Sequence, residues 1–388
     1  MLTSPRPHSE IDLFRDVADE QWADWKWQLK NRITSVEQLA RVIHVCEDEG
    51  EALRKGIAFR FGITPHYASL IDPEDPRCPM RRQVVPSTAE MYVAPEEMAD
   101  SLGEDSHSPA PNVTHRYPDR VLFLLTHECS LYCRYCTRRR IVGDQVSPSN
   151  ADLDAGVAYI QRTPAIRDVL ISGGDPLAVT DSRLEYLLSR LRAIPHVEII
   201  RIGTRMPVVL PQRLDVSLLE MLRKYHPLWL NTHFNHPFEL SSPSTRQCMN
   251  RIADAGIPTG NQTVLLKGIN DCPVIMRRLM HELLKVRCRP YYIYNCDLSE
   301  GLTHFRTSVE TGVSIVRSLQ GHTTGFGVPT FVVDAPGGGG KIPVMPQNVI
   351  SSEGGKVLLR NYEGREFSYR EGKSEIHGDS CALCKPTE

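Results

Sequence analysis

Apolar runs that favour β-strands alternate with amphipathic stretches along the middle of the chain, and this alternation restricts the fold more than any other feature. Amphipathic stretches at 182–194 and 274–286 predict helices. The runs with strand character span residues 121–126, 168–172, 197–203, 227–233, 258–266 and 290–295. Such an alternation gives a parallel sheet, closed or partly closed into a barrel, although the repeats fall short of a full barrel. The sequence therefore predicts an α/β fold with a partial barrel.

Segments without this alternation flank the predicted barrel. Residues 12–33 carry apolar side chains at helical spacing, and Thr34 and Glu37 form a capping-box pattern before a second helix. Dense prolines from residue 71 to 113 favour irregular chain, so we place a boundary near the end of that stretch. The expected parts are an N-terminal helical region with a linker (1–112), the barrel (113–340) and a C-terminal extension (341–388).

Charge and hydropathy exclude several classes of protein. The chain has 45 basic and 47 acidic residues, a formal net charge of -2, so no excess of positive charge indicates nucleic acid as its partner. We expect a small-molecule substrate. No apolar run approaches the roughly 20 residues that span a bilayer, and the first residues lack the pattern of a signal peptide. The sequence therefore predicts a cytoplasmic protein without a membrane partner.

Five of the eleven cysteines fall into two tight groups, three in one and two in the other. Cys129, Cys133 and Cys136 form a C-x3-C-x2-C pattern directly after the first barrel strand, where active-site loops of α/β barrels lie. Three thiolates on one loop can hold three irons of a 4Fe-4S cluster and leave the fourth iron open. An open iron can chelate S-adenosylmethionine (SAM) and pass it an electron, as in radical SAM enzymes. The alternative, a structural zinc site, needs a fourth ligand.

Two neighbouring features fit the same chemistry. Tyr135, just before the last cysteine, is aromatic, as in radical SAM proteins, where this residue can pack near the adenine. The next strand ends in Ser172, Gly173, Gly174 and Asp175, which resembles the glycine-rich segment that binds the amino group of SAM in those proteins. Glycines permit close backbone approach, whereas such a segment by itself is more often a turn.

A further motif joins an apolar run to Asp334, a run of glycines and Lys341. It is not a Walker loop, because Ile342 follows the lysine where that loop needs Ser or Thr. A lysine on such permissive backbone can form a Schiff base with pyridoxal phosphate (PLP) and withdraw when a substrate amine replaces it. An isolated lysine is usually a solvated surface charge, but a run of glycines costs folding entropy and indicates a need for close approach.

With these motifs in this order, the chain resembles the lysine 2,3-aminomutases, PLP-dependent members of the radical SAM superfamily. Further matching segments are LNTHFNHP, RPYYIYNCDLSEGLTHFRT and GHTTGFGVPTFVVDAPGGGGK. The resemblance covers nearly the whole chain. It implies a partial (β/α)6 barrel of the radical SAM type, a 4Fe-4S cluster on the three cysteines and PLP on Lys341.

The same resemblance implies roles for residues that bind PLP and the amino acid. Arg116, Tyr117 and Arg120 help hold PLP, Arg138 pairs with the substrate carboxylate, and Asp297 and Asp334 receive the substrate side-chain ammonium. These roles suit the residue types, because arginine binds a carboxylate through two parallel hydrogen bonds and a buried acidic pair needs a cation. The alternative for each residue is a surface salt bridge.

A zinc site and several partners are also implied by the family. In the aminomutases, a C-terminal cysteine cluster and a cysteine of the neighbouring subunit bind structural zinc. The matching cysteines here are Cys381, Cys384 and Cys272, while Asp379 replaces a third tail cysteine and His377 lies two residues earlier. Asp or His can also bind zinc. We expect a homo-oligomer that receives electrons from a donor such as flavodoxin or ferredoxin.

The predicted activity is that of an isomerase that converts L-lysine to β-lysine by 1,2-migration of the amino group. Alternatives within the family act on arginine, ornithine, glutamate or the lysine side chain of a protein, and the acidic pair disfavours glutamate. An RNA-modifying radical SAM enzyme conflicts with the PLP lysine and the charge balance. A metal-binding structural module would leave the glycine-rich segment before Lys341 unexplained.

Overall fold

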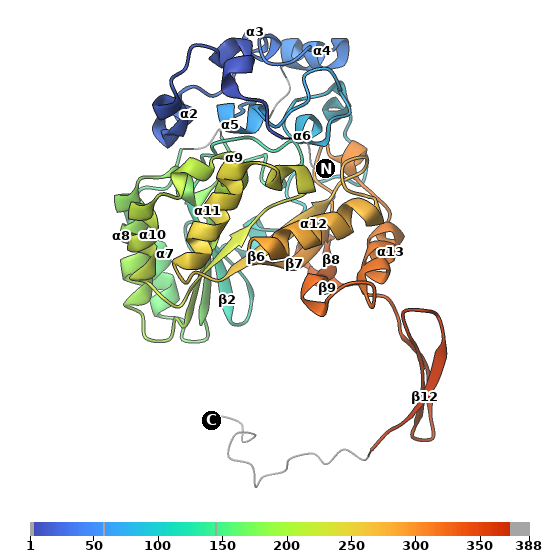
Figure 1. Ribbon diagram of the computed structural model, residues 1–388. Helices are drawn as coiled ribbons and strands as arrows, with labels where there is room; N and C mark the ends of the chain where they lie inside the picture. The colour runs from blue at the N-terminus through green and yellow to red at the C-terminus, as the bar shows by residue number, and fades with distance from the viewer. Residues whose placement is uncertain (1–3, 57–58, 144–145, 373–388) are drawn as a thin grey trace.

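A curved nine-stranded sheet forms the centre of the computed structural model, which describes residues 4–56, 59–143 and 146–372 (Figure 1). The strands follow one another in sequence order, β2 to β8 are parallel, and the edge strands β1 and β9 are antiparallel to their neighbours. They are β1 (Val113–Tyr117), β2 (Arg120–Thr126), β3 (Asp168–Gly173), β4 (Ile199–Gly203), β5 (Leu228–Thr232), β6 (Thr259–Leu265), β7 (Cys288–Asn295), β8 (Thr330–Ala335) and β9 (Gly340–Pro343).

The six predicted parallel strands are confirmed as β2 to β7, and β8 extends the parallel sheet by one strand. The edges of the sheet approach each other, because the backbone N–H of Lys341 on β9 donates a 2.9 Å hydrogen bond to the Tyr117 hydroxyl on β1. The sheet is therefore an almost closed barrel. The strands predicted from the sequence did not include the antiparallel edge strands β1 and β9.

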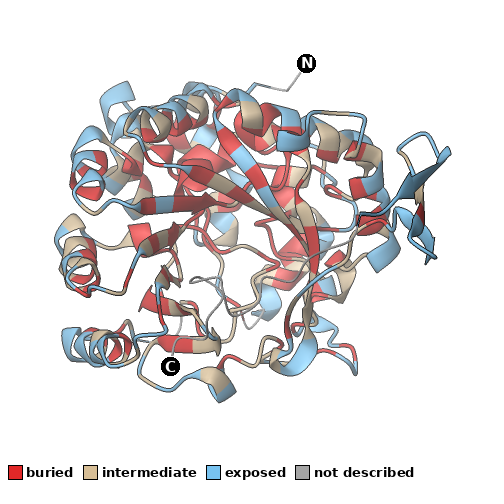
Figure 2. Ribbon diagram, turned by 90° about the horizontal axis from the view of Figure 1, so that it is seen from below, coloured by how far each residue is buried: buried red, intermediate tan, exposed pale blue. Residues whose placement is uncertain are grey.

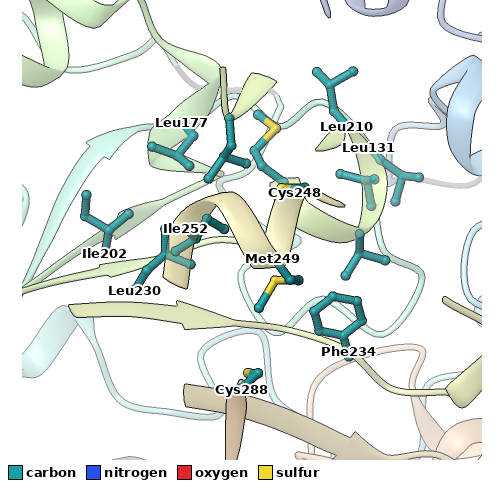
Figure 3. Close-up of a cluster of buried hydrophobic side chains, with 14 of the residues drawn as sticks. Leu131, Leu177, Ile202, Leu210, Leu230, Phe234, Cys248, Met249, Ile252 and Cys288 are labelled. Atoms are coloured by element: carbon teal, nitrogen blue, oxygen red, sulfur yellow. The ribbon is translucent and has the colours of Figure 1, made fainter. Parts of the chain in front are cut away.

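Helices cover the outer face of this sheet (Figure 1). On α11, the buried side chains of Cys248, Met249 and Ile252 lie in the same apolar core as Leu230 and Phe234 (Figure 3). Burial of these apolar faces is the main stabilising contribution of the helices. The helices are α7 (Asn150–Gln161), α8 (Asp181–Arg192), α10 (Val216–Arg223), α11 (Pro243–Asp254), α12 (Pro273–Lys285) and α13 (Val309–Leu319). The four-residue helix α9 (Met206–Val209) instead follows the carboxyl end of β4.

Short helices near the N-terminus form a separate layer at the top of Figure 1. They are α1 (Asp19–Ala23), α2 (Trp25–Lys30), α3 (Val36–Ala40), α4 (Glu47–Lys55), α5 (Pro65–Ala68) and α6 (Pro79–Arg82). The prediction of one helix over 12–33 is wrong, because Asp24 ends α1 and caps α2 by accepting from the Lys26 N–H at 2.9 Å. The capping box at Thr34 is also wrong: the Ser35 hydroxyl caps α3 by accepting from the Gln38 N–H at 3.3 Å.

A small antiparallel sheet projects from the body beyond β9 (Figure 1). It consists of β10 (Val349–Glu353), β11 (Lys356–Arg360) and β12 (Glu366–Arg370), and every residue of β10 and β12 is exposed (Figure 2). Within the described ranges, no helix has the length and apolar character needed to cross a membrane.

Candidate active site

A cavity of about 860 Å³ lies inside the curved sheet. Its wall includes residues at the carboxyl ends of parallel strands, which is where α/β barrels place their active sites. The cavity brings together the predicted cluster, cofactor and substrate residues Arg116, Tyr117, Arg120, Cys129, Cys133, Tyr135, Cys136, Arg138, Ser172, Gly173, Gly174, Asp175, Asp297, Asp334 and Lys341. Cys272 does not line it, and Cys381 and Cys384 lie outside the described residues.

The three cysteines of the loop after β2 share one poorly solvated wall of the cavity. Burial, with the charges of neighbouring thiols, raises the pKa of Cys129 well above its ordinary value and that of Cys136 to about 11. A bound metal would offset this cost by stabilising the thiolates. Among the described residues, no three His, Cys, Asp or Glu side chains surround a single ion position. Three thiols on one loop can supply one thiolate to each of three irons of a cluster.

Arg205 is a residue near the cysteines that the sequence analysis missed. Its Nη1 lies 2.8 Å from Cys133 Sγ, and its Nη2 lies 2.8 Å from the buried Glu239 carboxylate. The guanidinium therefore places a positive charge and an N–H donor beside this sulfur. Arg205 follows β4 by two residues, so its place at the carboxyl end of a barrel strand was the available signal.

Tyr135 forms an aromatic wall beside the cysteines together with His233, which follows β5. The rings stack with their centroids 5.6 Å apart, and Tyr135 Oη lies 3.0 Å from His233 Nε2. Burial, with a smaller contribution from the Arg205 charge, lowers the pKa of His233 to about 3. The imidazole is therefore neutral at ordinary pH, and the pair offers a flat, uncharged surface for a planar ring.

The glycine-rich segment after β3 packs against the chain that leads into the cysteine loop. A Cβ on Gly173, which has φ +137°, would lie 2.1 Å from the Thr126 carbonyl oxygen, and one on Gly174 would lie 2.1 Å from that of Glu128. The buried Asp175 carboxylate accepts from the Thr204 hydroxyl at 2.7 Å and the Arg205 N–H at 2.8 Å. Close packing therefore explains these glycines, and their role toward SAM stays a prediction.

Lys341 faces Asp334 across the pair β8–β9. The two residues are in register, and Nζ lies 3.2 Å from each carboxylate oxygen of Asp334. Burial and, to a smaller extent, the Asp334 charge raise the pKa of Asp297 to about 7, although the Lys341 charge opposes this rise. This end of the cavity therefore holds two carboxyl groups whose repulsion a cation relieves.

Arg116, Tyr117 and Arg120 lie on β1 and β2, beside Lys341. The Arg120 guanidinium carbon lies 3.9 Å from the centre of the Tyr117 ring, and Tyr117 holds the backbone of Lys341. Arg116 Nε is buried and has no hydrogen-bond partner among the described residues. An unsatisfied guanidinium N–H in a cavity that a second arginine also lines fits a phosphate group, so these residues suit the phosphate of PLP.

Comparison with known proteins agrees with this geometry. Residues 123–279 match the model of the radical SAM superfamily, and residues 316–385 match that named lysine-2,3-aminomutase. The chain is 54% identical to the L-lysine 2,3-aminomutase of Clostridium subterminale, over 96% of this chain and 90% of that protein. Its identity is also 54% to the enzyme of that name from Bacillus subtilis, over 96% of this chain and 79% of the relative.

A relative of different specificity is more distant. The glutamate 2,3-aminomutase of Clostridioides difficile is 45% identical, over 89% of this chain and 82% of that protein. A cysteine loop at the end of the first parallel barrel strand and the superfamily match together define a radical SAM enzyme. Within that superfamily, the chain belongs to the lysine 2,3-aminomutase family. The family implies a 4Fe-4S cluster and SAM.

Proposed function

We propose that the protein converts L-lysine to β-lysine by moving the 2-amino group to carbon 3. The observation that carries this proposal is the acidic pair Asp297 and Asp334, which already attracts the ammonium of Lys341. A lysine side chain supplies such a cation, whereas a glutamate side chain would add a third negative charge in a poorly solvated space. The higher identity to the lysine enzymes than to the glutamate enzyme supports the same substrate.

Cys129, Cys133 and Cys136 would hold the 4Fe-4S cluster, which with SAM supplies a radical that abstracts hydrogen. In this proposal, Arg205 donates to the Cys133 sulfur, and the wall of Tyr135 and His233 receives the adenine. Ser172, Gly173, Gly174 and Asp175 would line the place of the SAM amino group. The buried walls exclude water and other hydrogen donors from the reacting carbon, which matters because a radical reacts with any donor within reach.

Lys341 would bind PLP, with the phosphate on Arg116, Tyr117 and Arg120; PLP supplies a conjugated ring that spreads an unpaired electron. A bond between Nζ and PLP would take the free ammonium of Lys341 away from Asp334. Asp334 and Asp297 are then available for the side-chain ammonium of the substrate, and Arg138 for its carboxylate. Holding both ends of the amino acid fixes carbon 3 in the cavity.

An anaerobic assay with reconstituted cluster, SAM, PLP and a reductant tests the proposed function. We expect lysine to give β-lysine, and arginine, ornithine, glutamate and lysine within a peptide to react at least about tenfold more slowly. Chromatographic separation of the two lysine isomers measures the product. Preferred turnover of one of the other amino acids would refute lysine as the substrate.

Borohydride reduction tests Lys341 independently of turnover. We expect a single PLP-labelled peptide containing Lys341, because its amine lies in the cavity beside Arg116, Tyr117 and Arg120. Lys341→Ala should lose this label, whereas Lys267→Ala, a change at a lysine that does not line the cavity, should keep it. Mass spectrometry of the digested protein identifies the labelled residue, and a label on another lysine would contradict the assignment.

The C-terminal extension from residue 341 would carry a zinc site and join copies of the chain. Cys272, the N-cap of α12, is partly exposed, and we propose that it completes the set of Cys381, Cys384 and either His377 or Asp379 from another subunit. Elemental analysis should then find zinc in addition to iron. Protein that contains iron but no zinc would contradict the proposed zinc site. The reductant in the cell would be flavodoxin or ferredoxin, and residues 113–340, continued by the rest of β9 to Pro343, would form the catalytic barrel.

A further inference from the structure

Arg138, which lies two residues beyond Cys136, is already paired within the protein. Its Nε lies 3.0 Å from both carboxylate oxygens of Glu104, and its Nη2 lies 2.6 Å from Oε1. The Glu104 side chain is 9% exposed and that of Arg138 is 20% exposed. Both residues line the cavity. This ion pair is therefore part of the cavity wall, where solvent screening is weak.

Glu104 occupies one edge of the guanidinium and leaves the other edge open. Arginine presents N–H donors along two edges, Nε with Nη2 and Nη1 with Nη2, and each edge can bind a carboxylate through two hydrogen bonds. Arg138 Nη1 donates no hydrogen bond within residues 4–56, 59–143 and 146–372. A second carboxylate can therefore bind at this free edge while Glu104 stays in place.

The ion pair of Glu104 with Arg138 differs in permanence from the ion pair of Asp334 with Lys341. Lys341 Nζ, which lies 3.2 Å from the Asp334 carboxylate, would leave that contact if it held PLP, so the Lys341–Asp334 pair would be a changing one. Glu104 is held by its backbone: its N–H donates to Asp100 Oδ1 at 3.0 Å, and its carbonyl accepts from the Ser108 hydroxyl at 2.7 Å. The residue before it, Gly103, has φ +62°, and a Cβ there would lie 3.0 Å from the backbone of Gly337 and Gly338. Glu104 is thus fixed between the cysteine loop and the glycine run before Lys341.

We propose that Glu104 is a positioning residue for the amino acid substrate. By holding the Nε edge of Arg138, it presents the Nη1 edge to the substrate carboxylate in one orientation, so that carbon 3 lies at a fixed place in the cavity. The negative charge of Glu104 weakens attraction for the substrate carboxylate, and the gain is in alignment and not in affinity. This inference rests on the proposed function, in which Arg138 binds the carboxylate.

Variants at Glu104 and at a neighbouring ion pair separate positioning from a structural role. Glu104→Ala frees the guanidinium, whereas Glu104→Gln keeps the size and one acceptor but loses the charge. The matched control is Asp105→Asn, because Asp105 lies on the same segment, is 74% exposed and pairs with Arg140 at 2.9 Å. The measurements on cluster- and PLP-loaded enzyme are kcat and KM for lysine, and the ratio of free 5′-deoxyadenosine to β-lysine.

We expect kcat to fall about 100-fold in Glu104→Ala and about tenfold in Glu104→Gln, with KM within about threefold of the unmodified enzyme. Misalignment should raise the ratio of 5′-deoxyadenosine to β-lysine, because SAM is cleaved without productive hydrogen transfer. The spectral change of PLP on adding lysine should remain, and Asp105→Asn should behave as the unmodified enzyme does.

Two results would overturn the role of Glu104. One is an unchanged kcat and product ratio in both Glu104 variants. The other is a fall in activity that is fully accounted for by loss of iron or PLP, while the ratio of 5′-deoxyadenosine to β-lysine stays unchanged. That result would show that Glu104 has a structural role. If the unmodified protein prefers another amino acid, the proposed function fails, and the same comparison with that amino acid still decides whether Glu104 positions the substrate.

Discussion

Replacing Cys133 with alanine is expected to remove the iron–sulfur cluster and lower turnover by at least about 10⁴-fold, while PLP stays bound. Cys133 lines the cavity and its sulfur contacts Arg205, whereas Lys341 lies on β9 at the edge of the sheet. The cluster and the PLP residues thus come from different strands. Iron and sulfide content should fall as the absorbance of bound PLP persists.

Cys248→Ala is the matched control for Cys133→Ala. Cys248 is fully buried on α11, away from the cavity wall, so its loss leaves a small apolar void of modest cost. This variant should keep iron and activity. A Cys133→Ala protein with full iron content and turnover would contradict the radical chemistry, whereas loss of iron in both variants would indicate unfolding.

The double change Asp297→Lys and Asp334→Asn is expected to lower kcat/KM for lysine by at least about 10³-fold. The change replaces two carboxyl groups with one cation and one neutral amide, so the pocket repels the substrate ammonium. Binding of SAM and PLP should change little, because neither carboxylate takes part in the proposed contacts of those groups. Steady-state rates for lysine, arginine, ornithine and glutamate in both proteins measure the effect.

A matched control for the acidic pair is Glu282→Gln on α12. Its side chain is 4% exposed and pairs with Arg246 and Lys285, yet it does not line the cavity. This change should leave the preference among amino acids unaltered. Undiminished lysine turnover in the double variant would show that Asp297 and Asp334 do not select the substrate.

The pH dependence of the unmodified enzyme reports on the same pair. Because the pKa of Asp297 in the empty pocket is raised to about 7 by burial and by Asp334, this carboxyl group is protonated below that pH. A neutral group attracts an ammonium poorly. We therefore expect kcat/KM for lysine to fall by up to about tenfold per unit as pH decreases below 7, and this inflection should be absent in Asp297→Asn.

The parallel core could be predicted from the sequence, because buried strands such as β3 and β4 are apolar runs that need no distant partner to be recognised. The N-terminal helices could be predicted only in part. Their apolar spacing persists across Asp24, and only the side-chain cap shows that the helix breaks there. Thr34 and Ser35 are adjacent hydroxyl residues, and either could cap the helix that follows. The local sequence pattern does not show that Ser35 is the cap.

The residues of the candidate site could likewise be predicted only in part from the sequence. Cys133 and Lys341 carry their chemistry in local motifs, so sequence alone placed them in one candidate site, and the cavity brings them together. Glu104 and Arg205 belong to no local motif. Glu104 lies in a proline-rich segment without regular pattern, and its importance arises only when the fold brings it 2.6 Å from Arg138. Contacts of this long range depend on tertiary structure, which residue spacing does not encode.

The register of β8 and β9 also constrains the number of residues between them. Asp334 pairs with Lys341, and the turn between these strands begins at Pro336. Side chains alternate between the faces of a strand, so removing one glycine would bring Ile342 opposite Asp334 and turn the lysine to the other face. The length of this turn is therefore subject to a parity rule. Two added residues taken up by the same slip would keep the amine on the inner face but opposite Val332 instead of Asp334, whereas a change of one residue would turn the amine away.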